Sequence, residues 1–221
     1  LAGLLESAGP EADALLLLTL ARLEAPSQDL LVLERVRGYL GHPNERLASL
    51  ACLAADKLRD HQAVPDLIVL LSGSDANLRA RAYATLTDLT GLPLDRDAEA
   101  WIAWLDGALS WWDERSEPCR VALVSGAPAA AAAAIQEVAG QRLFLDQLAQ
   151  LLELALLRPE PDLVRSACRA LGTMPEPAAR VALERAAAHP DPAVAGEARA
   201  ALERLLHPRT PVRRSSPIRP P

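Results

Sequence analysis

The sequence predicts an all-α fold, a short right-handed α-solenoid of about five helical pairs. One residue pattern recurs at an interval of 31 in two separate places, from Asn44 to Asp75 and from Glu160 to Asp191. Periods of roughly 20–50 residues are typical of solenoids, in which each helical pair buries its apolar face against a neighbouring pair. Ala and Leu dominate and aromatic residues make up 3% of the chain, which favours closely packed helices over strands.

The clearest helical pair runs from Val64 to Gly91. Pro65 suits the first turn of a helix, which we expect to end near Ser72–Gly73. Asp75 then offers a side-chain oxygen to cap a second helix, and Gly91 is the expected end of that helix. The apolar face of the second helix consists of Leu78, Ala82, Leu86 and Leu89.

Two further pairs repeat this arrangement. The upstream pair spans Leu30 to Leu58, with a turn at residues 41–44. The C-terminal pair has one helix from Pro177 to Ala188 and another from Val194 to Leu206. Both turns contain a His-Pro dipeptide followed by Asn or Asp, residue types that interrupt helices and cap the next one.

The middle and the N-terminal part of the chain are less regular. Pro128 should open a helix that ends near Gly140. We expect a long apolar helix over Gln141–Leu157, paired with a second helix over Leu163–Gly172. Ala14–Leu23 is apolar on several faces, which predicts either a degenerate repeat at the end of the stack or a helix that needs a missing partner helix.

An insertion separates the two pairs of repeats. The interval from Asp75 to Glu160 is 85, which exceeds two periods by 23. We place the insertion at residues 92–118, where all four tryptophans occur. Asp97 can cap a helix from Ala98 to about Asp113. The tryptophans of this helix are Trp101, Trp104, Trp111 and Trp112.

The repeats resemble HEAT repeats of the short, phycobilisome-lyase-like type. The matching residues are Asp75, Leu78, Arg79, Ala82 and Leu86 in one copy and Asp191, Pro192, Val194, Ala198 and Leu202 in another. An element seen in some bacterial HEAT-like proteins is matched by Thr90, Gly91, Asp97, Trp101 and Trp104. The resemblance implies a bacterial helical-repeat protein, and it carries no particular activity because such repeats serve many unrelated binding proteins.

Charge divides the chain into an acidic body and a basic end. The formal net charge is −6, but residues 208–221 contain four arginines and no acid, so the remainder carries −10. Binding to nucleic acid normally needs a basic face, so we expect no nucleic-acid ligand. No apolar run approaches the roughly 20 residues of a membrane span, and we expect a cytoplasmic location.

Residues suited to metal binding or catalysis are scattered. Cys52, Cys119 and Cys168 fit no metal-ligand spacing, and Cys52 and Cys168 are expected to be small buried apolar residues. The histidines lie in expected turns or at helix ends, at His42, His61, His189 and His207. We therefore expect no metal, no cofactor and no catalytic residue. The His-Glu dipeptides of HEAT-like iron hydroxylases are absent from the sequence.

Two enzyme classes remain as alternatives. HEAT-like alkyl-DNA glycosylases use Trp, Asp and Arg, which invites comparison with Trp111, Trp112, Asp113 and Arg115. A base-excising enzyme must anchor phosphates, and the acidic body argues against that. The resemblance to phycobilisome lyases suggests a bilin lyase-like protein, but no bilin-specific residue can be carried over.

The expected function is that of a non-catalytic scaffold or adaptor that binds one or more proteins, such as a subunit of a larger assembly. We expect partner contacts at Trp111 or Trp112, because exposed Trp is enriched at binding hot spots. Arg79 and Arg165, at the start of second helices, are further candidates. The alternatives are core packing for the tryptophans and a hydrogen bond that bridges the repeat's own turn for the arginines.

The tail at residues 208–221 is predicted to be extended, whereas residues 1–207 form the solenoid. Its five prolines prevent a helix and favour a polyproline-like conformation. The tail residues expected to dock on another subunit or on the acidic body are Arg213, Arg214, Pro217 and Pro220. A solvated linker is the alternative.

Overall fold

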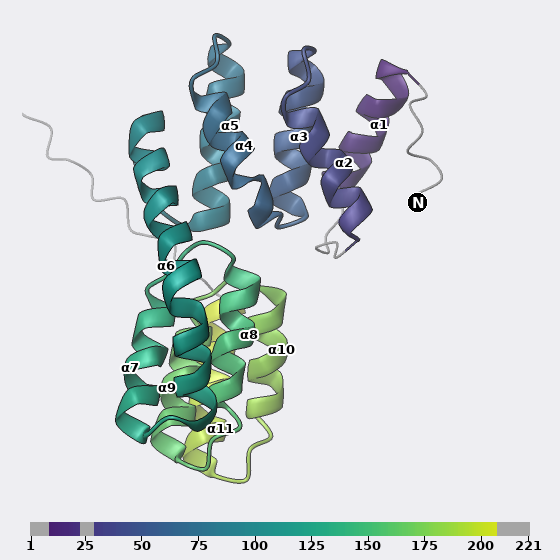
Figure 1. Cartoon of the computed structure of the whole chain (residues 1–221). Coiled ribbons are helices and arrows are strands. Elements are labelled where there is room, and N and C mark those ends of the chain that lie inside the picture. Colours follow the sequence, from purple (N-terminus) through teal and green to yellow (C-terminus); the bar gives the residue numbers. More distant parts are fainter. Residues whose placement is uncertain (1–8, 23–28, 207–221) are drawn as a thin grey trace, which may run out of the picture. The chain divides into compact units, whose positions relative to one another are not determined.

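The computed structural model describes residues 9–22 and 29–206, and this part of the chain is all-α (Figure 1). A short 3₁₀ turn at His61–Ala63 precedes α4. The helices are α1 Pro10–Leu20, α2 Leu30–Leu40, α3 Glu45–Lys57, α4 Val64–Leu71, α5 Ala76–Thr90, α6 Ala98–Ser125, α7 Pro128–Ala139, α8 Leu145–Ala155, α9 Pro161–Leu171, α10 Pro177–Ala186 and α11 Pro192–Leu206.

The chain divides into two compact units. The first unit comprises the described residues up to Pro118 together with Gly140–Leu148. The second unit comprises Cys119–Ala139 and the described residues from Ala149 onward. The division falls inside α6 and again inside α8, so two helices contribute to both units.

Each unit is built by stacking helical pairs. In the first unit α2 packs on α3 and α4 on α5, while α3 contacts α5, α2 contacts α4, and α1 contacts α3. In the second unit α9 contacts α7, α10 and α11, and α10 contacts α11. Contacts between second helices of successive pairs define an α-solenoid, as the repeat predicts. The right-handed sense stays a prediction.

In most copies of the repeat, the recurring Asn or Asp caps the second helix and the recurring Ala is buried. Asn44, Asp75 and Asp191 cap the helices that follow them through side-chain oxygens that accept backbone N–H groups. The recurring alanines are all 0% exposed, at Ala51, Ala82, Ala167 and Ala198. A methyl side chain at this position lets neighbouring second helices approach closely. Glu160 is the exception, because it makes no cap and pairs with Arg158 instead.

Most of the predicted helices are confirmed, and two are corrected. The predicted helix ending near Asp113 continues through Pro118 to Ser125. Pro118 lacks an N–H and disfavours a helix interior, but the extension buries Cys119 and Leu123, which offsets that cost. The predicted helix over Gln141–Leu157 is also too long, because α8 begins at Leu145 and ends at Ala155.

Candidate binding site

The residues of the Trp-rich pattern connect the start of α6 to the loop that follows α5. Gly91 adopts a left-handed φ of 68° and ends α5. Trp101 is fully buried, and its Nε1 donates to the backbone oxygen of Asp95 at 2.9 Å. Trp104 packs edge-on against Trp101, with ring centroids 5.7 Å apart. These two tryptophans therefore belong to the core of the first unit.

Trp111 and Trp112 lie further along α6 and are both half-buried. Their ring centroids are 6.3 Å apart. Trp112 also packs edge-on against Phe144, at 5.3 Å and an interplanar angle of 79°. Each ring thus combines packing with partial exposure, a combination typical of binding hot spots.

The first unit has a pocket of about 110 Å³ that is lined in part by Phe144, the ring that Trp112 contacts. We call it the Leu109 pocket, and it is lined by His61, Gln62, Pro65, Leu105, Leu109, Leu143 and Phe144. Leu143 is buried, whereas Leu109 is 38% exposed and lies where the pocket meets solvent. The lining is mostly apolar and comes from three segments that are distant in the sequence.

Phe144 has an unusual backbone conformation for a bulky residue. Its φ of 55° lies in the left-handed region, which costs a non-glycine residue about 1–3 kcal/mol. Its backbone oxygen accepts from Gln147 and Leu148 in the first turn of α8. The surrounding packing thus holds the Phe144 ring at the pocket in spite of the strain, and such strain is concentrated at functional sites.

A buried polar network fixes His61 and Gln62 at the pocket. Asp60 is 3% exposed, and its Oδ1 accepts from the backbone of Gln62 and lies 3.5 Å from Arg37 Nη1. Arg37 Nη1 also donates to Gln62 Oε1 at 2.6 Å. Burial raises the pKa of the Asp60 carboxyl, and the Arg37 guanidinium opposes this rise only in part. His61 is itself 4% exposed.

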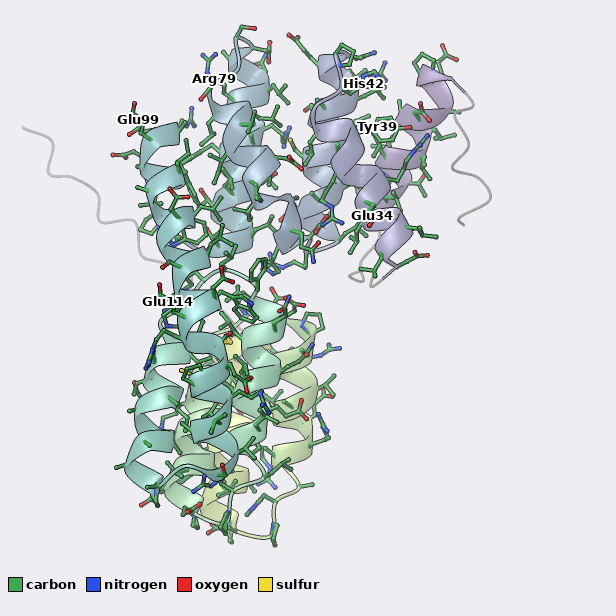
Figure 2. All side chains as sticks on the ribbon, viewed as in Figure 1. Glu34, Tyr39, His42, Arg79, Glu99 and Glu114 are labelled. Atoms are coloured by element: carbon green, nitrogen blue, oxygen red, sulfur yellow. The ribbon has the colours of Figure 1, made fainter. Side chains whose placement is uncertain are left out.

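Arg79 takes the bridging role that was the alternative to partner binding. Its Nη1 donates to the backbone oxygens of Gly73 and Ser74, at 2.8 and 2.6 Å. These bonds close the turn between α4 and α5, and Figure 2 labels the Arg79 side chain on α5. Two backbone carbonyl groups of this turn are satisfied in this way.

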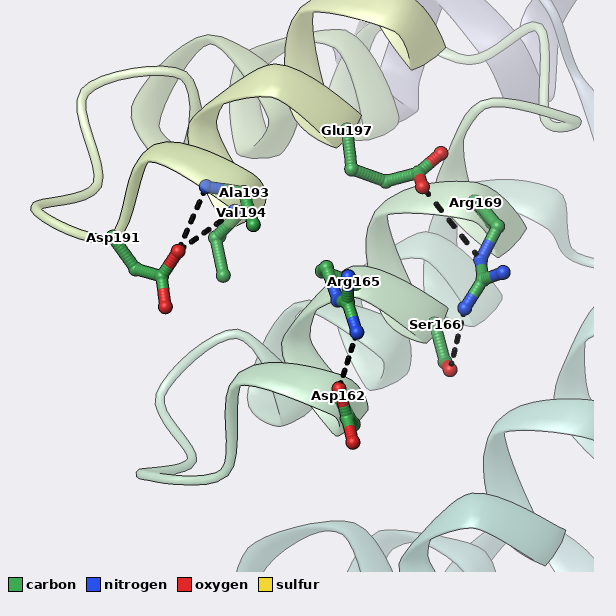
Figure 3. A network of polar contacts seen from close by, with 8 residues as sticks. All are labelled: Asp162, Arg165, Ser166, Arg169, Asp191, Ala193, Val194 and Glu197. Atoms are coloured by element: carbon green, nitrogen blue, oxygen red, sulfur yellow. Dashed lines mark hydrogen bonds and ion pairs between the residues drawn. The ribbon is translucent and has the colours of Figure 1, made fainter.

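Arg165 belongs to a polar network on α9 and α11 in the second unit (Figure 3). It pairs with Asp162, and its side chain is 40% exposed. Arg169 donates to Ser166 at 3.2 Å and lies 4.0 Å from Glu197. The tail candidates, Arg213, Arg214, Pro217 and Pro220, lie outside the described residues.

The histidines of the two similar turns have matching structural roles. Nδ1 of His42 accepts from the backbone of Asn44, and Nδ1 of His189 accepts from the backbone of Asp191, both at 3.0 Å. Each bond holds the residue that caps the following helix. Within residues 9–22 and 29–206, no group of three His, Cys, Asp or Glu side chains is arranged to hold a metal ion.

The sequence singled out Trp112, which packs against Phe144, but none of the residues that line the pocket was predicted as a site residue. Phe144 and Leu143 were expected inside a helix, and their place in a loop depends on contacts with α6 and with residues 61–65. The distances in sequence between residues 61–65, 105–109 and 143–144 follow no repeat, so the sequence does not predict that they meet. The single phenylalanine of the sequence was the one available signal.

Comparison with known proteins assigns no family to the chain. No family model and no curated protein matches its sequence. Similar solved structures include an engineered protein from the Northeast Structural Genomics Consortium, at 18% identity and a TM-score of 0.36, covering 93% of this chain and 94% of that one. A designed armadillo repeat protein matches at 18% identity and a TM-score of 0.35, covering 92% of this chain and 98% of that one.

Human deoxyhypusine hydroxylase, solved with glycerol, matches at 18% identity and a TM-score of 0.33, covering 93% of this chain and 94% of that one. Because these TM-scores are low, we derive nothing from the three likenesses, and the helix contacts alone support the solenoid. No helix in the described ranges is long and apolar enough to cross a membrane.

Proposed function

We propose that this chain is a non-catalytic scaffold that binds a partner protein by taking one of its apolar side chains into the Leu109 pocket. The observation that supports this most directly is the pocket itself. It is apolar, it opens at the exposed side chain of Leu109, and strained Phe144 forms part of its lining. Fully desolvated anchor side chains in such pockets supply most of the affinity at protein interfaces.

The volume of the pocket limits which side chain of a partner can fill it. A volume of about 110 Å³ is smaller than the roughly 150 Å³ of an engineered cavity that binds benzene. A leucine, isoleucine or valine side chain fits this space better than an indole. The neighbouring Trp112, half-buried against Phe144, offers further contact area to the same partner segment.

Of the two arginines predicted to contact a partner, one stays a candidate and the other does not. Arg165 has a partly exposed side chain and stays a candidate for a separate contact on the second unit. Arg79 is left out, because its guanidinium already donates to two backbone oxygens. Nucleic-acid chemistry is not proposed, since Asp113 is an exposed carboxylate directly beside Trp112 and would repel phosphate.

The test is affinity purification from a lysate of the source cells with three full-length baits: wild type, Leu109→Arg and Val121→Arg. Val121 is a matched control, because it is 49% exposed on the same helix and does not line the pocket. A captured protein is then purified and titrated against each bait. We expect Leu109→Arg to weaken binding by about tenfold or more and Val121→Arg to leave it unchanged.

Equal binding of one partner to all three baits would refute the pocket as its site. Failure of the wild-type bait to enrich any protein would remove the support for a scaffold. Circular dichroism of each variant checks that its helices are intact. A fourth bait that ends at residue 207 tests the tail, because loss of the partner from that bait assigns its binding to residues 208–221.

A further inference from the structure

Three carboxylates form a row along the exposed side of α6. Glu99, Asp106 and Asp113 are spaced by seven residues, and all three are exposed. Seven residues advance a helix by about 10.5 Å and leave side chains within about 20° of one another around its axis. Figure 2 shows Glu99 on α6, in the part of the helix that belongs to the first unit. We call these three residues the carboxylate row.

The carboxylate row has no cationic partner in the described part of the chain. None of its members takes part in a hydrogen bond or an ion pair through its side chain there. Glu114, on another side of the same helix, instead accepts from Ser110 at 3.1 Å. The row therefore leaves three negative charges unpaired along one edge of a helix.

Exposed apolar side chains lie next to the row. Ile102 follows Glu99 by three positions and precedes Asp106 by four, and Leu109 stands in the same relation to Asp106 and Asp113. Residues three and four apart are neighbours on a helix surface. Ile102 is 48% exposed and Leu109 38%. Because Leu109 also lines the pocket, the row and the pocket belong to one continuous surface.

We propose that this surface binds an extended, basic peptide segment whose apolar side chain enters the Leu109 pocket and whose cationic side chains pair with the carboxylate row. Three residues of a polyproline II segment advance about 9 Å and return side chains to the same face, which is close to the spacing along the row. The preferred segment therefore has Arg or Lys at every third position. This inference rests on the proposed function, since it names the chemistry of the segment that the pocket receives.

The experiment measures fluorescence anisotropy of labelled Ser/Arg peptides with the full-length protein. The first peptide contains one leucine and an arginine at every third position. The second has the same composition with the arginines adjacent to one another, and the third replaces the leucine by serine. We expect the first peptide to bind several-fold more tightly than either of the others, with an affinity that falls as salt is raised.

Two triple variants of the protein distinguish the effect of the carboxylate row on binding from the effect of overall net charge. Glu99→Gln, Asp106→Asn and Asp113→Asn together should weaken the first peptide roughly tenfold, as expected for three exposed ion pairs. The matched control carries Glu11→Gln, Glu34→Gln and Glu45→Gln, three exposed positions in the first unit away from α6. The control should bind as wild type does.

The outcomes distinguish this inference from the proposed function. Binding that depends on the leucine but is indifferent to the row, the salt and the arginine spacing overturns this inference and leaves the pocket function standing. Binding that is equally strong without the leucine overturns the pocket function and, with it, this inference. Absence of binding by all three peptides contradicts both.

Discussion

Arg158 donates to both carboxylate oxygens of Glu160, from Nε at 3.1 Å and from Nη2 at 2.9 Å. Its Nη1 also donates to the backbone oxygen of Gly126 at 3.0 Å. One guanidinium thereby connects the end of α6 with the turn before α9 inside the second unit. The fork of the arginine side chain is required for all three bonds, since an ammonium group cannot reproduce that geometry.

We expect Arg158→Lys to lower the urea midpoint of unfolding at neutral pH. The hydrogen bond from Arg158 lowers the pKa of the Glu160 carboxyl. A carboxyl with a lowered folded pKa contributes stability above its unfolded pKa and loses it as pH falls through the folded value. The difference between variant and wild type should therefore shrink below about pH 4. A difference that stays constant from pH 7 to pH 3 would contradict this account.

Gly172, the C-cap of α9, lies directly against Ala201 of α11. A Cβ at this position would lie 2.8 Å from the Cβ of Ala201 and 3.1 Å from its Cα. We expect Gly172→Ala to destabilise the protein by about 1–3 kcal/mol, because the helices must move apart. Chemical denaturation measures the change.

The matched control is Gly196→Ala on α11. A Cβ there would meet no atom within 4 Å. Because glycine is unfavourable in a helix interior, this variant should gain about 0.5–1 kcal/mol. Similar effects from the two substitutions would mean that the α9–α11 spacing is not tight.

The Asp60 carboxyl gives the first unit a pH-dependent stability. Burial raises its folded pKa, so its contribution is most favourable below the unfolded value near 4 and is lost as pH rises through the folded value. Asp60→Asn keeps an oxygen for the Gln62 N–H and does not ionise. Relative to wild type, the variant should gain stability as pH is raised from 4 to 7 in urea titrations. Parallel curves for the two proteins would refute the assignment.

The cysteines should be unreactive in the folded protein. Burial raises the pKa of the Cys52 thiol to about 12 and that of Cys168 to about 11. Both side chains are 0% exposed. Because only the thiolate reacts, we expect a disulfide reagent at pH 8 to modify these two residues at the rate of unfolding. Rapid modification of either one before denaturant is added would contradict the structure.

The repeat could be predicted because its signals are local. Asn44, Asp75 and Asp191 stand directly before the helices that they cap, and the alanine seven positions on packs between second helices in every copy. The continuation of α6 was not predictable in the same way. Pro118 is a helix breaker by local preference, and burial of Leu123 against distant residues decides the outcome.

The sequence drew the partner-binding prediction to Trp111 and Trp112, which stays untested, and gave no sign of the pocket that Phe144 lines. Trp112 was predicted to lie in the inserted helix. Its contact with Phe144 joins two positions whose separation does not match the repeat, so the sequence could not predict it. The left-handed conformation of Phe144 is set by packing and not by residue type, which would favour glycine. For Arg79, named as a partner-binding candidate with turn bridging as the alternative, the hydrogen bonds match the bridging alternative, which depends only on its distance from the turn along the helix.

The first unit is interrupted in the chain, since it needs Gly140–Leu148 after the polypeptide has already left it at Pro118. Leu143 and Phe144, which line the Leu109 pocket together with Leu105 and Leu109, are made only after the whole of α6 and α7. At about 5–20 residues per second, residues 119–148 take roughly two to six seconds to make. Until Leu143 and Phe144 are made, the Leu109 pocket lacks part of its lining, so the first unit is completed only after Cys119–Ala139 of the second unit has been synthesised.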